Sequence, residues 1–170
     1  MTEKSQKVGL ISDTHIPVVA KAIPENVIHI FRKNKVALIL HAGDLVSLAV
    51  IDELNKIAPA VLAVHGNMDS LGVATQLPEI NETEILGHKI GVIHGSGGPQ
   101  GFIEKVEDMI RGKDYEIVVC GHLHNAFVEK KFGRLFVNPG SPTDKRWAER
   151  NTVGILEITS QDVNPKIIEI

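Results

Sequence analysis

The sequence predicts an α/β fold in which two sheets face each other and helices cover their outer sides. Up to residue 80, short apolar runs alternate with longer amphipathic segments, as in βαβ units. After residue 80, strand-like runs separated by tight turns dominate. No linker rich in Pro, Gly or Ser separates the two parts, so we expect one domain over residues 1–170.

The first part is predicted to form a βαβαβ unit with right-handed crossovers. Its almost continuously apolar runs are typical of strands buried on both faces of a parallel sheet, and they cover residues 7–12, 36–40 and 60–64. Helices are predicted between them at 24–34 and 47–57. Pro24 suits the first turn of one helix, and Ser47 suits the N-cap of the other.

The second part is predicted to contain mostly strands and one helix. Residues 82–87 and 88–95 form an expected hairpin whose turn is Gly87-His88. A helix from about 100 to 111 and a buried strand at 116–121 follow. The remaining predicted strands are 126–133, 134–140, 152–159 and 166–170, and the clearest turn among them is Gly133-Arg134.

Composition limits the classes of function. With 43% hydrophobic and 23% charged residues the chain is globular. A net charge of -3 and 4% aromatic residues argue against nucleic acid as a stable partner. The single cysteine, Cys120, cannot form an internal disulfide, and no run of 18 apolar residues or signal peptide is present. We therefore expect a cytoplasmic protein that does not associate with membranes.

Side chains of the metal-ligand type lie at the carboxyl ends of the predicted central strands. In chain order they are Asp13, His15, Asp44, Asn67, His94, His122 and His124. In open α/β sheets the carboxyl ends of the strands converge on one crevice. Asp13 or Asp44 alone could be a turn residue or a helix cap, but such isolated roles do not explain donors at five successive strand ends. A shared metal site is the better interpretation.

The type and number of donors indicate which metals would bind. Carboxylate, imidazole and amide donors without a thiolate suit Mn, Fe, Co, Ni or Zn. Seven donors are too many for one ion and fit two ions that share a carboxylate. Two ions about 3.5–4 Å apart can clamp the attacking and leaving oxygens of a phosphoryl displacement and lower the pKa of a bridging water to about 7.

Five short motifs in a fixed order carry a resemblance to a known family. They are "DTH" at 13–15, "HAGD" at 41–44, "GNMD" at 66–69, "HG" at 94–95 and "GHLH" at 121–124. With "NPGSP" at 138–142, they resemble the calcineurin-like metallophosphoesterase superfamily, above all its small bacterial and archaeal phosphodiesterases. The resemblance covers about residues 8 to 142 and implies a four-layer αββα sandwich of the metallo-dependent phosphatase type.

The resemblance also implies a reaction and a ligand set. The chain would be a hydrolase of small phosphodiesters that uses a hydroxide bridging two divalent ions, most often Mn, with Ni, Co, Fe or Zn as substitutes. The first ion would take Asp13, His15, His124 and the shared Asp44, and the second would take Asp44, Asn67, His94 and His122. Asp44, Asn67 and His94 would be the catalytic residues, and Asn67 would also meet the substrate. Similar small proteins form homodimers or homotetramers.

One position departs from the family pattern. Many members carry a histidine at the third position of the Gly-Asn-x-Asp motif to protonate the leaving group, but this chain has Met68, which has no proton to donate. We therefore expect a preference for good leaving groups. Met68 itself would fill an apolar gap, and Asp69 would hold the loop. His65 is a candidate substitute acid, although a strand-end role suits it better.

Two further alternatives stay open. Arg146, close to the "NPGSP" loop, could bind a substrate phosphate or could be a solvated charge. The chain could also be a protein-binding scaffold of the retromer-subunit type or a metal-bound regulatory module. Such scaffolds typically have an eroded donor set, whereas all seven positions are occupied here.

Overall fold

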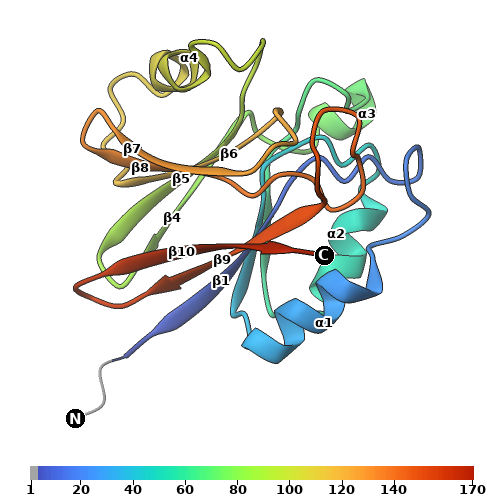
Figure 1. Cartoon of the computed structure of the whole chain (residues 1–170), viewed down its shortest axis with the longest axis horizontal. Coiled ribbons are helices and arrows are strands. Elements are labelled where there is room, and N and C mark those ends of the chain that lie inside the picture. Colours follow the sequence, from blue (N-terminus) through green and yellow to red (C-terminus); the bar gives the residue numbers. More distant parts are fainter. Residues whose placement is uncertain (1–3) are drawn as a thin grey trace.

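A computed structural model describes residues 4–170 and contains two five-stranded sheets that face each other (Figure 1). The first sheet has the order β10-β9-β1-β2-β3, in which β1, β2 and β3 are parallel to one another. Its strands are β1 (Gln6–Ile11), β2 (Leu38–His41), β3 (Val61–Ala63), β9 (Thr152–Ile158) and β10 (Val163–Glu169). Because β9 and β10 are antiparallel to their neighbours, the sheet is mixed.

The second sheet has the order β4-β5-β6-β8-β7. Its strands are β4 (Ile80–Ile85), β5 (His88–His94), β6 (Ile117–Gly121), β7 (Phe127–Lys131) and β8 (Arg134–Asn138). The central strands β5, β6 and β8 are parallel, and the edge strands β4 and β7 are antiparallel to their neighbours. The carboxyl ends of the parallel strands therefore lie side by side at one end of each sheet.

The helices lie outside the two sheets. They are α1 (Glu25–Asn34), α2 (Ala49–Asn55), α3 (Leu71–Ala74) and α4 (Phe102–Met109). Buried side chains of α1 and α2 pack on the first sheet, and those of α4 pack on the second (Figure 1). The predicted four-layer αββα sandwich is confirmed. Among residues 4–170 no helix is long and apolar enough to cross a membrane.

The strands are apolar along their whole length because their side chains enter two different cores. Some side chains lie between the two sheets, and others pack under the helices. In β1, Val8 and Leu10 lie between the sheets, whereas Ile11 packs with the helices. In β6, Val119 lies between the sheets and Val118 packs with α4. Each central strand is thus buried on both faces, as the sequence indicated.

Both predicted hairpin turns were one residue too late. The turns are Leu86-Gly87 and Phe132-Gly133, because Ile85 pairs with His88 and Lys131 pairs with Arg134 across the strands. All four turn residues have positive φ angles between 51° and 92°. Positive φ at both positions is what a two-residue hairpin turn of type I′ requires. The position of each turn is therefore set by the pair of residues that closes the hairpin.

Three details near the ends of elements also differ from the predictions. The helix α2 begins after Leu48 as N-cap, so Ser47 lies one residue too early, although its Oγ accepts a hydrogen bond from the amide of Ala49 (3.3 Å). Pro24 is the N-cap of α1 and not part of its first turn. The strand β10 begins at Val163 and includes a proline, which an edge strand tolerates.

Replacing Phe31, a fully buried side chain between α1 and the first sheet, tests this packing. Phe31→Ala should lower the free energy of unfolding by about 3–5 kcal/mol because it removes buried apolar surface and leaves a cavity. Phe132→Ala, at an exposed turn, is the matched control and should change it by about 0.5 kcal/mol or less. Equal effects in urea unfolding would contradict this assignment of the core.

Candidate metal centre

The seven predicted donor residues gather where the carboxyl ends of the two sheets meet. They come from the segments after β1, β2, β3 and β6 and from the end of β5. Five of these residues have positive φ angles, namely Asp13, His15, Asp44, His122 and His124. This conformation is costly for residues other than glycine, and such strain is concentrated at functional sites.

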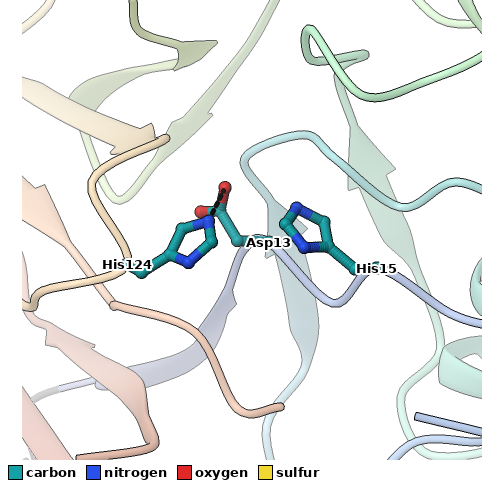
Figure 2. A group of neighbouring side chains, drawn as sticks. All are labelled: Asp13, His15 and His124. Carbon is teal, nitrogen blue, oxygen red and sulfur yellow. Dashed lines mark ion pairs between the residues drawn. The ribbon is translucent and has the colours of Figure 1, made fainter. Parts of the chain in front are cut away.

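The first group of donors consists of Asp13, His15 and His124, whose ligand atoms all lie within 4.8 Å of one another. Figure 2 shows the two imidazole rings on either side of Asp13. His124 Nε2 lies 3.4 Å from Asp13 Oδ1. His15 Nε2 lies 3.3 Å from Asp44 Oδ2, so the shared carboxylate reaches this group.

The second group surrounds the same Asp44 carboxylate from another direction. His94 Nε2 lies 3.4 Å from Asp44 Oδ2 and 3.1 Å from Asn67 Oδ1. His122 Nδ1 lies 2.9 Å from the same Asn67 oxygen. Because Asp13 Oδ1 is only 4.0 Å from His94 Nε2, the two groups are contiguous, and all seven predicted donors are brought together.

An unpartnered buried atom indicates that these residues fit a cation. Asp13 Oδ1 is buried and has no hydrogen-bond partner among residues 4–170, whereas its Oδ2 accepts hydrogen bonds from Ser12 Oγ (2.6 Å) and the His122 amide (3.0 Å). Buried carboxylate oxygens are normally paired, so an unpaired one beside imidazole nitrogens fits a metal ligand. The mixed oxygen and nitrogen donors suit divalent transition metals.

The protonation of the cluster follows from its charges. Burial opposes ionisation of Asp44, but hydrogen bonds with His15 and His94 outweigh it and hold the pKa of this carboxyl well below its usual range. Burial lowers the pKa of His94, but the contact with Asp44 and the charge of Asp13 outweigh burial and raise this pKa to about 9. The same kinds of contact raise the pKa of His15. Metal ions must therefore compete with protons for these histidines.

The Asp44 loop is fixed by the carboxylate of Asp69. Asp69 Oδ2 accepts hydrogen bonds from the amides of Asp44 (3.1 Å) and Gly66 (2.7 Å), and its Oδ1 accepts one from Val46 (2.5 Å). This confirms the prediction that Asp69 holds the loop. Gly66 is required here, because a Cβ at this position would lie 2.2 Å from Asp44 Oδ1.

Sequence reasoning missed one buried acid at the site. Asp144, after the "NPGSP" motif, has its Oδ2 3.0 Å from His15 Nδ1. The motif marked the loop, but no local pattern indicated which of its residues turns inward. The neighbouring His41 is buried, contacts Thr14 Oγ1 through Nε2 (3.1 Å) and has its pKa lowered to about 3 by burial, so it is a packing residue.

A cleft of about 940 Å³ opens onto the donors. Asn67, His122 and Met68 line it, together with apolar side chains such as Phe102 and Phe127. The prediction that Met68 fills an apolar gap is wrong, because its side chain is half exposed in the cleft. Arg146 also lines the cleft, and its guanidinium pairs with Asp144. His65 is not one of the lining residues.

The sequence is similar to that of known proteins over almost its whole length. Residues 7–161 match the calcineurin-like phosphoesterase superfamily domain. A probable metallophosphoesterase of Methanothermobacter thermautotrophicus is 38% identical over 162 residues, which cover 95% of this chain and 91% of the relative. A phosphodiesterase of Methanocaldococcus jannaschii is 30% identical over 174 residues, which cover 96% and 99% of the two chains.

Two solved structures are similar along almost their whole length. Vacuolar protein sorting 29 from Cryptosporidium parvum has a TM-score of 0.78 at 26% identity, with 98% of each chain covered. A structure described as that of a novel archaeal phosphodiesterase has a TM-score of 0.75 at 27% identity, with 97% of this chain and 100% of that chain covered.

The raised pKa of His94 predicts how the stability of the metal-free protein depends on pH. Because folding raises this pKa from 6.5 to about 9, the folded chain binds more protons than the unfolded chain between these pH values. The stabilisation is complete below pH 6.5 and is lost as the pH rises through 9, by roughly 1–3 kcal/mol.

Urea unfolding of chelator-treated protein, followed by circular dichroism, measures this change. His94→Gln should remove most of the decline, and His29→Gln, on the exposed face of α1, should keep it. Constant or increasing stability of the wild type between pH 6.5 and 9 would contradict the assigned protonation.

Proposed function

The chain belongs to the calcineurin-like phosphoesterase superfamily and is a hydrolase of phosphoester bonds, and from this premise we propose that it is a metal-dependent phosphodiesterase with two divalent ions. The observation that carries the proposal is the convergence of seven donor residues around the Asp44 carboxylate. Among residues 4–170 the buried Asp13 Oδ1 has no hydrogen-bond partner, which supports cation binding at this position.

Each ion is assigned one of the two groups of donors. We assign Asp13, His15, His124 and one side of Asp44 to the first ion, and Asp44, Asn67, His94 and His122 to the second. When bound, two divalent ions, Mn above the others, would activate a water for attack and offset the charge of the phosphate. Asp44, Asn67 and His94 are the proposed catalytic residues, because Asp44 is shared by the two groups of donors and His94 Nε2 lies beside both Asp44 Oδ2 and Asn67 Oδ1.

The substrate is proposed to be a small phosphodiester. Asn67 supplies a neutral amide oxygen, so it adds a ligand without repelling an anionic phosphate. Arg146 lines the cleft with 60% of its side chain exposed, which supports a contact with the phosphate from the rim. Leu123 and Phe127, which line the cleft and are only partly buried, offer apolar surface to an organic substituent of the diester.

Met68 determines which leaving groups suit the enzyme. Its side chain is 53% exposed and lines the cleft beside the donors, where the family pattern places a histidine. Its main-chain amide donates a hydrogen bond to Asp44 Oδ1 (2.7 Å), so the backbone stays in place whichever side chain is present. Without a proton donor here, diesters that expel a stable anion should be cleaved best.

A non-catalytic role is the second candidate. The similarity to vacuolar protein sorting 29 supports a protein-binding scaffold on the same fold. Val18, Leu71 and Trp147 are exposed apolar side chains that such a scaffold could use. A metal-bound regulatory module is the third candidate. Turnover by the metal-loaded protein separates these candidates from the enzyme.

Hydrolysis of bis-p-nitrophenyl phosphate by Mn-loaded protein tests the proposed function. We expect turnover that is abolished by a chelator and lowered about 100-fold or more by Asp44→Ala, because the shared ligand is lost. Asp52→Ala, at an exposed carboxylate of α2, should leave the rate unchanged. Metal binding without turnover would favour the scaffold or the regulatory module.

Restoring a proton donor tests the role of Met68. Met68→His should raise the rate for diesters with alkyl leaving groups more than for nitrophenyl diesters, within the roughly 10² to 10⁴ range that general acid catalysis contributes. Met68→Leu, which also lacks a donor, is the control. If Met68→His leaves the ratio of the two rates unchanged, the preference has another origin.

A further inference from the structure

We infer that Asp144 is a positioning residue that orients both histidines of the first metal group, and that Arg146 holds it in place from the cleft. This inference rests on the proposed two-metal function. Asp144 is a buried acid that lies after all seven donor residues in the sequence. Arg146 would then have a role besides a contact with the substrate.

The carboxylate of Asp144 lies behind the two imidazoles. Its side chain is 1% exposed, and Oδ2 lies 3.0 Å from His15 Nδ1 and 3.7 Å from His124 Nδ1. The buried His124 Nδ1 has no hydrogen-bond partner within residues 4–170, and the Asp144 carboxylate is the acidic group that faces it. Because a carboxylate only accepts hydrogen bonds, it favours the tautomer in which each ring carries its hydrogen on Nδ1.

Protonation of Nδ1 leaves Nε2 of each ring free to bind a metal. These are the atoms that point toward the shared site, where His15 Nε2 lies 3.3 Å from Asp44 Oδ2 and His124 Nε2 lies 3.4 Å from Asp13 Oδ1. A carboxylate behind a ligating histidine fixes the tautomer and the orientation of the ring. Here the single carboxylate of Asp144 faces the rings of both His15 and His124.

Arg146 and Ser141 hold Asp144 in this position. Arg146 Nε lies 3.0 and 2.9 Å from the two carboxylate oxygens, and its Nη2 donates a further hydrogen bond to Oδ2 (2.5 Å). The guanidinium therefore compensates a buried charge. Ser141 Oγ accepts a hydrogen bond from the Asp144 amide (2.9 Å) and donates one to Asp13 O (2.7 Å), which ties the loop to the first ligand.

The second metal group is oriented in a different way. His94 Nδ1 lies 2.7 Å from the main-chain oxygen of Ala42, and His122 Nε2 lies 3.0 Å from that of Gly97. Neither contact involves Asp144. Loss of Asp144 should therefore weaken one metal site and spare the other.

Calorimetric titration of the metal-free full chain with Mn²⁺ tests the inference. Wild type should bind two ions. In Asp144→Asn one site should lose about 10- to 100-fold in affinity, because the amide can donate to Nδ1 and favour the wrong tautomer, and the other site should be unchanged. Asp144→Glu, which keeps the carboxylate, should restore part of the loss. If each site binds Mn²⁺ with the same affinity in Asp144→Asn as in wild type, the inference is overturned.

A second pair of variants keeps the test decisive if Asp144→Asn does not fold. Arg146→Ala removes the outer support and should selectively weaken the same site. Arg150→Ala is the matched control, because Arg150 lies in the same loop, is similarly exposed and pairs with Glu169. If Arg146→Ala and Arg150→Ala bind both ions as wild type does, the supporting role of Arg146 is wrong, and with an unfolded Asp144→Asn the inference is rejected.

Imidazole nitrogen NMR of the zinc-loaded protein gives an independent signature. His15 and His124 should carry their protons on Nδ1, and Asp144→Asn should disturb these two signals and leave those of His94 and His122 in place. A wild type that binds fewer than two ions would contradict the proposed function itself. Two bound ions with unaltered signals in the variant would contradict the role of Asp144 alone.

Discussion

The site depends on one constraint, which is that Asp13, Asp44 and Asp144 are all buried within one group of histidines. An unpaired buried carboxylate costs several kcal/mol, so each oxygen needs a donor or a cation. Hydrogen bonds from main-chain amides, imidazoles and Arg146 satisfy most of them. The oxygen left over, Asp13 Oδ1, lies in the centre of the proposed ligand set.

The two-sheet architecture makes this burial possible. The parallel strands of both sheets end beside the site, and three apolar cores pack behind them. This packing supports the positive φ angles at five donor residues, each of which costs of order 1–3 kcal/mol. Packing energy far from the site therefore maintains a backbone that the donor residues would not adopt by themselves.

Much of this arrangement could be predicted from the sequence because it depends on local patterns. Apolar runs such as 7–12 indicated strands buried on both faces, and Asp13 to His124 followed strand ends where ligands gather. The exact hairpin turns could not be predicted, because the pairing of Ile85 with His88 and of Lys131 with Arg134 selects them. Asp144 was missed for a related reason, since only the folded loop brings it behind His15.

Anomalous diffraction at the manganese edge from crystals soaked in Mn²⁺ tests the two-metal site most directly. We expect two peaks about 3.5–4 Å apart, with Asp44 between them. One peak should be surrounded by Asp13, His15 and His124, and the other by Asn67, His94 and His122. A single peak, or two peaks that do not share Asp44, would contradict the proposed two-metal site.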